Sequence, residues 1–111
     1  MNRYLKIINN YGVNAQLKKL NEEVYEFEEA VLEKHNKEHI TEEIADVFVI
    51  LSQFIIKFNL DEDKIMEIME QKVNRQIKRI EKNKIEKILK KVNNIVENID
   101  TDYLTKKTRR R

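Results

Sequence analysis

The chain has 111 residues, 38% of them charged, and a formal net charge of only +2. This length suits one compact domain and is too short for two domains with separate cores. One glycine, no proline and no cysteine exclude a turn-rich sheet, a glycine-rich phosphate loop, a disulfide framework and a thiolate metal site. The remaining composition is rich in helix formers and predicts an all-α protein.

The first predicted elements are a short amphipathic helix and a long core helix. The short helix covers residues 4–8 and ends before Gly12, where glycine favours the left-handed turn that closes a helix. The long helix covers residues 14–34, where apolar side chains recur every three or four residues and predict a stripe buried along one side. This stripe consists of Leu17, Leu20, Val24, Phe27 and Val31.

A second core helix is predicted over residues 40–58, after a polar break at 35–38. Apolar residues occupy most of its circumference, which indicates burial against more than one partner and so predicts a dimer interface. The acidic residues at 61–63 are suited to cap the next helix and to form its first turn. The main stripe of this second helix is Ile40, Ile44, Val47, Phe48, Leu51, Ile55 and Phe58.

Two more helices are predicted in the C-terminal part of the chain. The step of five residues from Ile80 to Ile85 turns the apolar stripe by about 140°, so we expect a bend or break near Asn83. The helices together predict an antiparallel bundle of four to five helices, completed by oligomerisation as a homodimer or homotetramer. The parts of this single domain, residues 1–111, are a core at 11–82, a C-terminal helix at 84–99 and a basic tail at 100–111.

The sequence also bears on where the protein works. It lacks an apolar run of signal-peptide or membrane-spanning length, so we expect a soluble cytoplasmic protein that does not contact a membrane. Lys and Arg dominate from Lys72 to the C-terminus, but no nucleic-acid-binding fold motif accompanies them. We therefore interpret the basic tail as a solvated segment and do not expect nucleic acid as a partner.

Two carboxylate pairs carry the main chemical signal. Glu23 and Glu26 lie three residues apart on one helix, and Glu43 and Asp46 lie three residues apart on the next. Each pair falls beside its apolar stripe, so antiparallel packing would bring four carboxylates together at the edge of the core. Like charges at that density are unfavourable without a cation, and all-oxygen ligands suit Mg²⁺, with Mn²⁺ as a substitute.

Two other interpretations of the acidic and histidine residues are weaker. A solvated acidic face remains open, because the same Glu-x-x-Glu spacing occurs at Glu67 and Glu70. A di-iron centre requires Glu-x-x-His, and neither His35 nor His39 has a Glu three residues before it. Zinc bound by the two histidines would lack a third ligand.

Basic and amide side chains near the two pairs predict contacts with a phosphorylated substrate. Gln16 and Lys19 share the flank of Glu23 and are interpreted as nucleotide-binding residues, with ordinary helix packing as the alternative. Lys72, Arg75 and Arg79 follow one edge of the third helix, where cationic side chains would bind phosphate oxygens; a solvated basic face is the alternative. Ser52 is the only serine, so water activated by a metal is the one hydrolytic mechanism with a visible set of residues.

These residues resemble a known family. Glu22-Glu23-Val-Tyr-Glu26 and Glu42-Glu43-Ile-Ala-Asp46 are separated as in the MazG-like nucleotide pyrophosphohydrolases, in which Glu-x-x-Glu is followed by Glu-x-x-Asp at the head of an apolar helix. Tyr11-Gly12, Gln16 and Leu20 add to the likeness, which spans roughly residues 11–80.

The resemblance implies a dimeric or tetrameric helical bundle that cleaves a nucleoside triphosphate between its α and β phosphates. By position, Lys72 and Arg75 correspond to the basic residues of the family, whereas Gln76 stands where members often have Asn or Arg. The Mg²⁺ ligands implied by the resemblance are Glu23, Glu26, Glu43 and Asp46.

The sequence therefore predicts a Mg²⁺-dependent hydrolase that converts an NTP or dNTP to the monophosphate and pyrophosphate. Glu23 or Glu26 would orient the attacking water, and Lys72 and Arg75 would offset developing negative charge. Three alternatives stay open at this point: a non-catalytic helical interaction protein, a dUTP or dCTP hydrolase, and a phosphoribosyl-ATP hydrolase.

Overall fold

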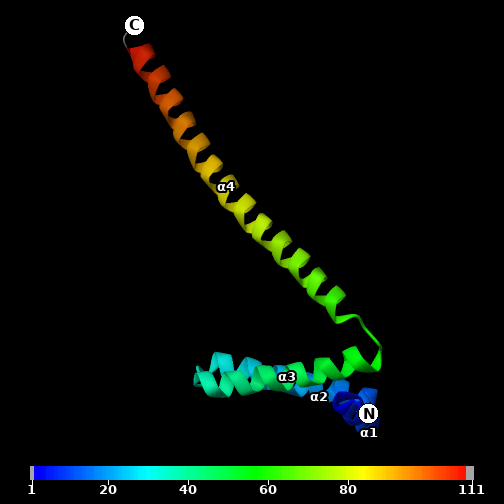
Figure 1. Ribbon diagram of the computed structural model, residues 1–111. Helices are drawn as coiled ribbons and strands as arrows, with labels where there is room; N and C mark the ends of the chain where they lie inside the picture. Colours follow the sequence, from blue (N-terminus) through cyan, green and yellow to red (C-terminus); the bar gives the residue numbers. More distant parts are fainter. Residues whose placement is uncertain (1, 110–111) are drawn as a thin grey trace. The chain divides into compact units, whose positions relative to one another are not determined.

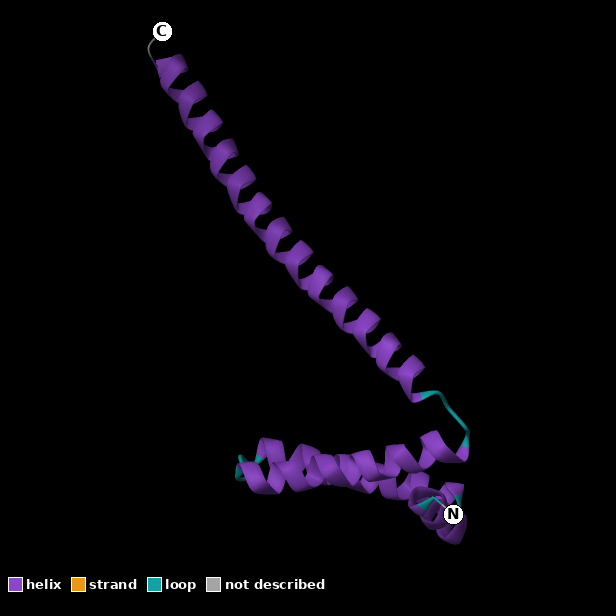
Figure 2. Cartoon of the chain, viewed as in Figure 1, coloured by secondary structure: helices purple, strands orange, loops and turns teal. Residues whose placement is uncertain are grey.

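The computed structural model describes the backbone of residues 2–109 and the side-chain surroundings of residues 2–99. This part of the chain contains four α-helices and no strand, which confirms the predicted all-α class (Figures 1 and 2). The chain divides into two units, Met1–Ile65 and Met66–Arg111, and each is described by itself. The helices are α1 (Arg3–Tyr11), α2 (Val13–Leu32), α3 (Lys37–Lys57) and α4 (Glu62–Arg109).

Polar side chains and one glycine set where the helices begin and end. The Oδ1 of Asn2 accepts a hydrogen bond from the backbone N–H of Tyr4, and Asn36 caps α3 in the same way. The carboxylate of Asp61 accepts hydrogen bonds from two N–H groups of the first turn of α4, as predicted for the acidic segment 61–63. Between α1 and α2, Gly12 has a φ of 96°, a value that glycine adopts without steric cost.

In the first unit, α2 and α3 form a helical hairpin and α1 packs against both (Figure 1). The short connection between Leu32 and Lys37 makes α2 and α3 antiparallel. The fully or nearly fully buried side chains lie along the faces that these helices turn to one another. They are Ile8 on α1, Gln16, Glu23 and Ala30 on α2, and Glu43, Ile50 and Gln53 on α3.

This buried face differs from the predicted one. The apolar stripe of α2 was predicted to form the core, yet Leu17, Val24 and Val31 are exposed, while Glu23 from the adjacent row is buried. The prediction that the carboxylates lie at the edge of the core was therefore wrong for Glu23 and Glu43, which lie in the seam between α2 and α3. The physical reason is that a two-helix hairpin covers only one narrow face of each helix, and periodicity does not show which face that is.

A bend or break was predicted near Asn83, between two separate helices. The division into two helices was wrong, because α4 continues through this residue to Arg109. Residues 81–84 include no proline or glycine, and an ion pair of 3.9 Å between Lys82 and Glu86 spans the position. A change in the phase of an apolar stripe changes which face is apolar without breaking the backbone. The side chains of the predicted basic tail, residues 100–111, lie outside the described residues. No helix in the described part of the chain is both long and apolar enough to cross a membrane.

Candidate metal and nucleotide site

Three carboxylates converge in the seam between α2 and α3. One oxygen each from Glu23, Glu43 and Asp46 lie within 4.8 Å of one another. Glu23 is only 6% exposed and Glu43 only 7%, whereas Asp46 is exposed. Antiparallel packing of α2 and α3 brings Glu23 opposite Glu43 and Asp46, so three of the four carboxylates that the sequence predicted to converge lie together.

The two buried glutamates are only half satisfied. The Oε1 of Glu23 lies 3.0 Å from Nζ of Lys19, and Oε1 of Glu43 lies 3.5 Å from Nε2 of His39. The second oxygen of each carboxylate, Oε2, is buried without a hydrogen-bond partner in the described structure. A buried carboxylate oxygen without a partner is costly, so this arrangement fits a bound cation.

Glu26 lies beside the three converging carboxylates without joining their close contact. The negative charge of Glu23 raises the pKa of Glu26, with a further contribution from a hydrogen bond between the two side chains. The pKa of Asp46 is also raised, first by loss of solvation and then by the charge of Glu23. The negative charge of Glu23 contributes to both shifts, and such a charge favours binding of a proton or another cation nearby.

Lys19 brings one positive charge to the carboxylates from within α2. It lies one helical turn before Glu23, and the hydrogen bond and charge of Glu23 raise the pKa of Lys19. The ammonium group is half-exposed, so it reaches the carboxylates from the solvent side. The residue predicted to bind nucleotide therefore lies where it touches both the acidic cluster and the neighbouring pocket.

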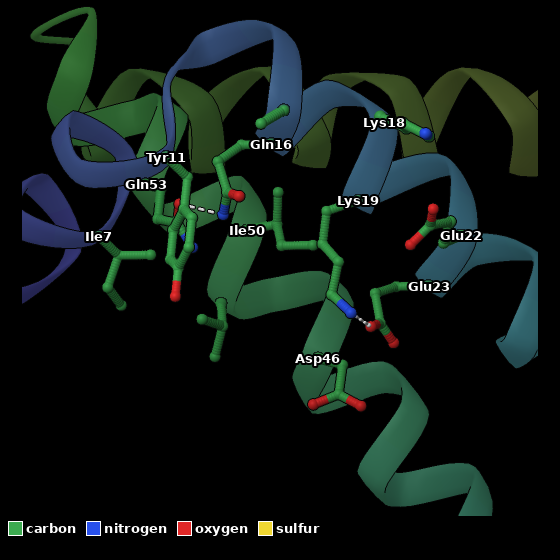
Figure 3. A pocket seen from close by; sticks show the side chains of 12 residues that line it. Ile7, Tyr11, Gln16, Lys18, Lys19, Glu22, Glu23, Asp46, Ile50 and Gln53 are labelled. Atoms are coloured by element: carbon green, nitrogen blue, oxygen red, sulfur yellow. Dashed lines mark hydrogen bonds and ion pairs between the residues drawn. The ribbon is translucent and has the colours of Figure 1, made fainter.

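An open pocket of about 600 Å³ adjoins the carboxylates within the first unit (Figure 3). Such a volume is in the range of small-ligand sites. Four predicted site residues line it: Gln16, Lys19, Glu23 and Asp46. Sequence reasoning gave no role to the other lining residues, which are Ile7, Tyr11, Ala15, Lys18, Glu22, Val49, Ile50 and Gln53.

Gln16 and Gln53 form a buried polar contact at this pocket. The Nε2 of Gln16 donates a hydrogen bond of 2.8 Å to Oε1 of Gln53, which joins α2 to α3 (Figure 3). Gln53 could have been found in the sequence, since it lies seven residues, or two helical turns, after Asp46 and so on the same flank of its helix.

The histidines do not support zinc or iron. His35 pairs with Glu33 at 2.9 Å and its ring lies 4.7 Å from the ring of His39. Among the described residues, the one set of three or more close ligand atoms contains carboxylates and no imidazole. The oxygen-only donor set is the one expected for a hard cation such as Mg²⁺.

Comparison with known proteins identifies the family. Residues 7–73 match the family described as phosphoribosyl-ATP pyrophosphohydrolase. The chain belongs to the phosphoribosyl-ATP pyrophosphohydrolase family. This family is part of the MazG-like all-α NTP pyrophosphatase superfamily, so the resemblance seen in the sequence is confirmed. No curated protein and no solved structure matched the chain.

Membership of the pyrophosphohydrolase family makes the chain a hydrolase that acts on phosphoric anhydrides, with nucleotide pyrophosphohydrolase activity in general. The family is typically metal-dependent, in keeping with the acidic cluster. The matched segment contains all four predicted carboxylates and every residue that lines the pocket. The predicted basic residues on α4 are all exposed. Lys72 falls inside the matched segment, whereas Arg75 and Arg79 follow it. They belong to the second unit, so their role at the site stays a prediction.

Proposed function

We propose that this family member hydrolyses a nucleoside or deoxynucleoside triphosphate between its α and β phosphates, in a Mg²⁺-dependent reaction that releases the monophosphate and pyrophosphate. The observation that carries this proposal is the convergence of Glu23, Glu43 and Asp46 beside a pocket of about 600 Å³. The non-catalytic scaffold considered from the sequence has lost its support, because the family is one of hydrolases.

The metal would be held by the seam carboxylates. The unpaired Oε2 atoms of Glu23 and Glu43 would supply two negative donors, and Asp46 would supply a third from the exposed side. Glu26, whose pKa is raised by the charge of Glu23, is proposed as a fourth. When bound, Mg²⁺ or Mn²⁺ neutralises phosphate charge and lowers the pKa of a coordinated water. Mg²⁺ suits the site because it keeps several waters and accepts phosphate oxygens together with a few carboxylates.

The chain's own residues bind and orient the substrate. Lys18 and Lys19 line the pocket, where their ammonium groups attract the phosphates. Glu23 or Glu26 orients the water that attacks, while the oxygen bridging the α and β phosphates leaves with pyrophosphate. Lys72 and Arg75 are proposed to offset the negative charge that develops on the leaving group, with Arg79 as a further phosphate contact.

We propose that the active form is a homodimer or homotetramer. Support comes from large apolar side chains that are exposed in the single chain although they form regular stripes on α2 and α3. Large apolar side chains that stay exposed in regular rows are a common sign of an interaction site on a folded protein. The residues are Leu17, Val24 and Val31 on α2, and Ile44, Phe48 and Leu51 on α3.

Phosphoribosyl-ATP is a second candidate substrate, and the family description favours it specifically. Its hydrolysis would use the same site, because a triphosphate is again cleaved to release pyrophosphate. The dUTP and dCTP alternatives lack such support.

The experiment is a panel of nucleoside triphosphates, deoxynucleoside triphosphates and phosphoribosyl-ATP, offered to the purified chain with Mg²⁺, with Mn²⁺ and with a chelator. Pyrophosphate and inorganic phosphate are measured separately. Release of pyrophosphate that stops with the chelator supports the proposal. Release of inorganic phosphate alone, or turnover that the chelator does not affect, would refute it.

A further inference from the structure

The glutamine pair Gln16–Gln53 has hydrogen-bonding capacity that the fold does not use. Gln53 is 1% exposed and Gln16 is 7% exposed, and both line the pocket. Their mutual hydrogen bond uses one hydrogen on Nε2 of Gln16 and one lone pair on Oε1 of Gln53. Within the described part of the chain neither side chain makes a second hydrogen bond, so Oε1 of Gln16 remains an acceptor and Nε2 of Gln53 remains a donor.

An acceptor beside a donor is the complement of a nucleobase edge, which presents a donor beside an acceptor. If both side-chain amides rotate by half a turn, so that oxygen and nitrogen exchange places, the order of donor and acceptor on the pair is reversed and a hydrogen bond between the two amides is kept. The pair can therefore match a base edge in either orientation. A phosphate group offers acceptors only and would satisfy half of the pair.

The position of the pair along the helices fits a nucleotide that spans the pocket. Gln16 precedes Glu23 by seven residues on α2, and Gln53 follows Asp46 by seven residues on α3. Two helical turns, about 10.5 Å at 1.5 Å per residue, thus separate the amides from the carboxylates on both helices. The amides thus line one end of the pocket and the carboxylates the other. A nucleotide whose triphosphate is held at the carboxylates can place its base at the amides.

An aromatic ring is available at the amide end. Tyr11 lines the same pocket, is 65% exposed, and precedes Gly12, whose carbonyl accepts the backbone N–H of Gln16. Figure 3 draws Tyr11 together with Gln16 and Gln53 among the side chains that line the pocket. Base–aromatic stacking adds to affinity and accepts any base, because every base has a π-face.

We propose that Gln16 and Gln53 form a base-binding subsite, in which the paired amides read the edge of the nucleobase and Tyr11 stacks on its face. This inference rests on the proposed function in one respect: the triphosphate is taken to bind at the carboxylates. It names a ligand class, a nucleobase joined to a phosphate chain, and it assigns specificity to residues that take no part in the chemistry.

The test compares two ligands that differ in the nucleoside. Calorimetry with Mg²⁺ measures the affinity of α,β-methylene analogues of nucleoside triphosphates against that of inorganic tripolyphosphate. The double variant Gln16→Leu/Gln53→Leu removes both amides, so no donor or acceptor is left unpaired in the seam and the fold should be kept, with unchanged or higher melting temperature. Asn9→Leu, an amide removed from α1 outside the pocket lining, is the matched control.

The wild-type chain is expected to bind at least one analogue about tenfold or more tightly than tripolyphosphate, since two hydrogen bonds and a stacked ring are worth more than the ~1.4 kcal/mol that tenfold requires. The double variant should lose this preference and keep its affinity for tripolyphosphate, while Asn9→Leu keeps both. Equal binding of both ligands by the wild-type chain, or a preference retained in the double variant, would overturn the subsite.

If the double variant does not fold, Tyr11→Leu takes its place, because this side chain is exposed. It should reduce the preference about tenfold, and an unchanged preference would overturn the proposal. Because the analogues are bound without being cleaved, failure of the subsite is distinguishable from failure of the proposed hydrolysis, which the pyrophosphate assay reports.

Discussion

Glu23 on α2 and Glu43 on α3 each bury one carboxylate oxygen that has no hydrogen-bond partner. Both have a basic neighbour one helical turn earlier: Nζ of Lys19 lies 3.0 Å from Oε1 of Glu23, and Nε2 of His39 lies 3.5 Å from Oε1 of Glu43. Lys19 therefore offsets part of the negative charge of Glu23, while the buried Oε2 atoms of both glutamates have no partner.

Replacement Glu43→Gln should separate a metal ligand from a structural carboxylate. If Glu43 binds the cation, the variant loses several kcal/mol of charge stabilisation, which corresponds to at least about a hundredfold lower turnover at ~1.4 kcal/mol per tenfold. The rise in melting temperature on adding Mg²⁺ should shrink as well, because the metal stabilises only the folded state. Without metal the variant should be as stable as the wild type or more so.

The control for this variant is Glu28→Gln, an exposed residue of α2 that lies outside both the close carboxylates and the pocket lining. It should retain wild-type turnover and Mg²⁺ response. Turnover by the folded Glu43→Gln variant at the wild-type rate and metal dependence would remove Glu43 from the site.

The stability of the metal-free chain should fall as the pH rises above the ordinary pKa values of Asp and Glu. The pKa values of Glu26 and Asp46 are raised in the folded state, so in this window the native state holds more protons than the unfolded state. Under that condition the free energy of unfolding decreases with rising pH, and the loss is complete above the folded-state pKa values.

Thermal unfolding from about pH 4 to pH 7 in a chelator checks this, with Asp46→Asn as the comparison. The variant should show a shallower decline than the wild type, and saturating Mg²⁺ should flatten the wild-type curve. If the stability of the variant and of the wild type fell equally with pH in the chelator, Asp46 would not be a cause of the decline.

Lys19→Met should change metal and phosphate binding in opposite directions. Removing the ammonium group leaves Glu23 without its 3.0 Å partner, so Mg²⁺ alone should bind more tightly. Tripolyphosphate with Mg²⁺ should bind more weakly, by about tenfold for a lost charge-assisted contact of 1.5–3 kcal/mol that is partly screened by solvent. Calorimetry of both ligands measures the two effects, and Lys37→Met, at the exposed start of α3, is the control. A parallel loss of both affinities would show that Lys19 acts on the fold instead.

Phe48→Glu should convert an oligomer to a monomer. Phe48 is 62% exposed and belongs to the apolar stripe of α3, so a charge there would be buried in any interface that covers the stripe. Light scattering coupled to gel filtration gives the mass of wild type and variant. Leu32→Glu is the control, because Leu32 is 80% exposed and lies outside the stripes. A monomeric wild-type chain at micromolar concentration would contradict the proposed self-association.

Much of the local structure could be predicted from the sequence. The predicted ranges 14–34 and 40–58 agree with α2 and α3 to within a few residues, since caps and apolar periodicity act locally. The convergence of Glu23 with Glu43 and Asp46 was also predicted, because residues three or four apart share a helical face. The continuity of α4 was missed because a phase change in its apolar stripe was interpreted as a break in its backbone.

The depth of the carboxylates and most of the pocket were not predictable. Whether Glu23 or Val24 faces α3 depends on how α2 is rotated about its own axis. The apolar pattern does not determine this rotation, because either residue could occupy the contact face. Tyr11, on α1, lines the pocket because α1 packs against the hairpin, which is a tertiary contact without a periodic signal. In the sequence Gln53 falls on the same flank of its helix as Asp46, but only its hydrogen bond with Gln16 shows why this residue is an amide.

The seven-residue spacing of Gln16, Glu23 and Ala30 has a consequence for how stability and activity are balanced. In an antiparallel helical pair such positions form the central seam, where leucine gives the strongest association. Here Gln16 and Glu23 occupy two of these three places, so a variant with apolar residues at both should be more stable, and the loss of Glu23 from the acidic cluster should make it inactive. The same polar residues also fix the alignment of α2 against α3, since an all-apolar seam would allow neighbouring alignments of similar energy. Selection for thermal stability alone would therefore be expected to remove the active site first.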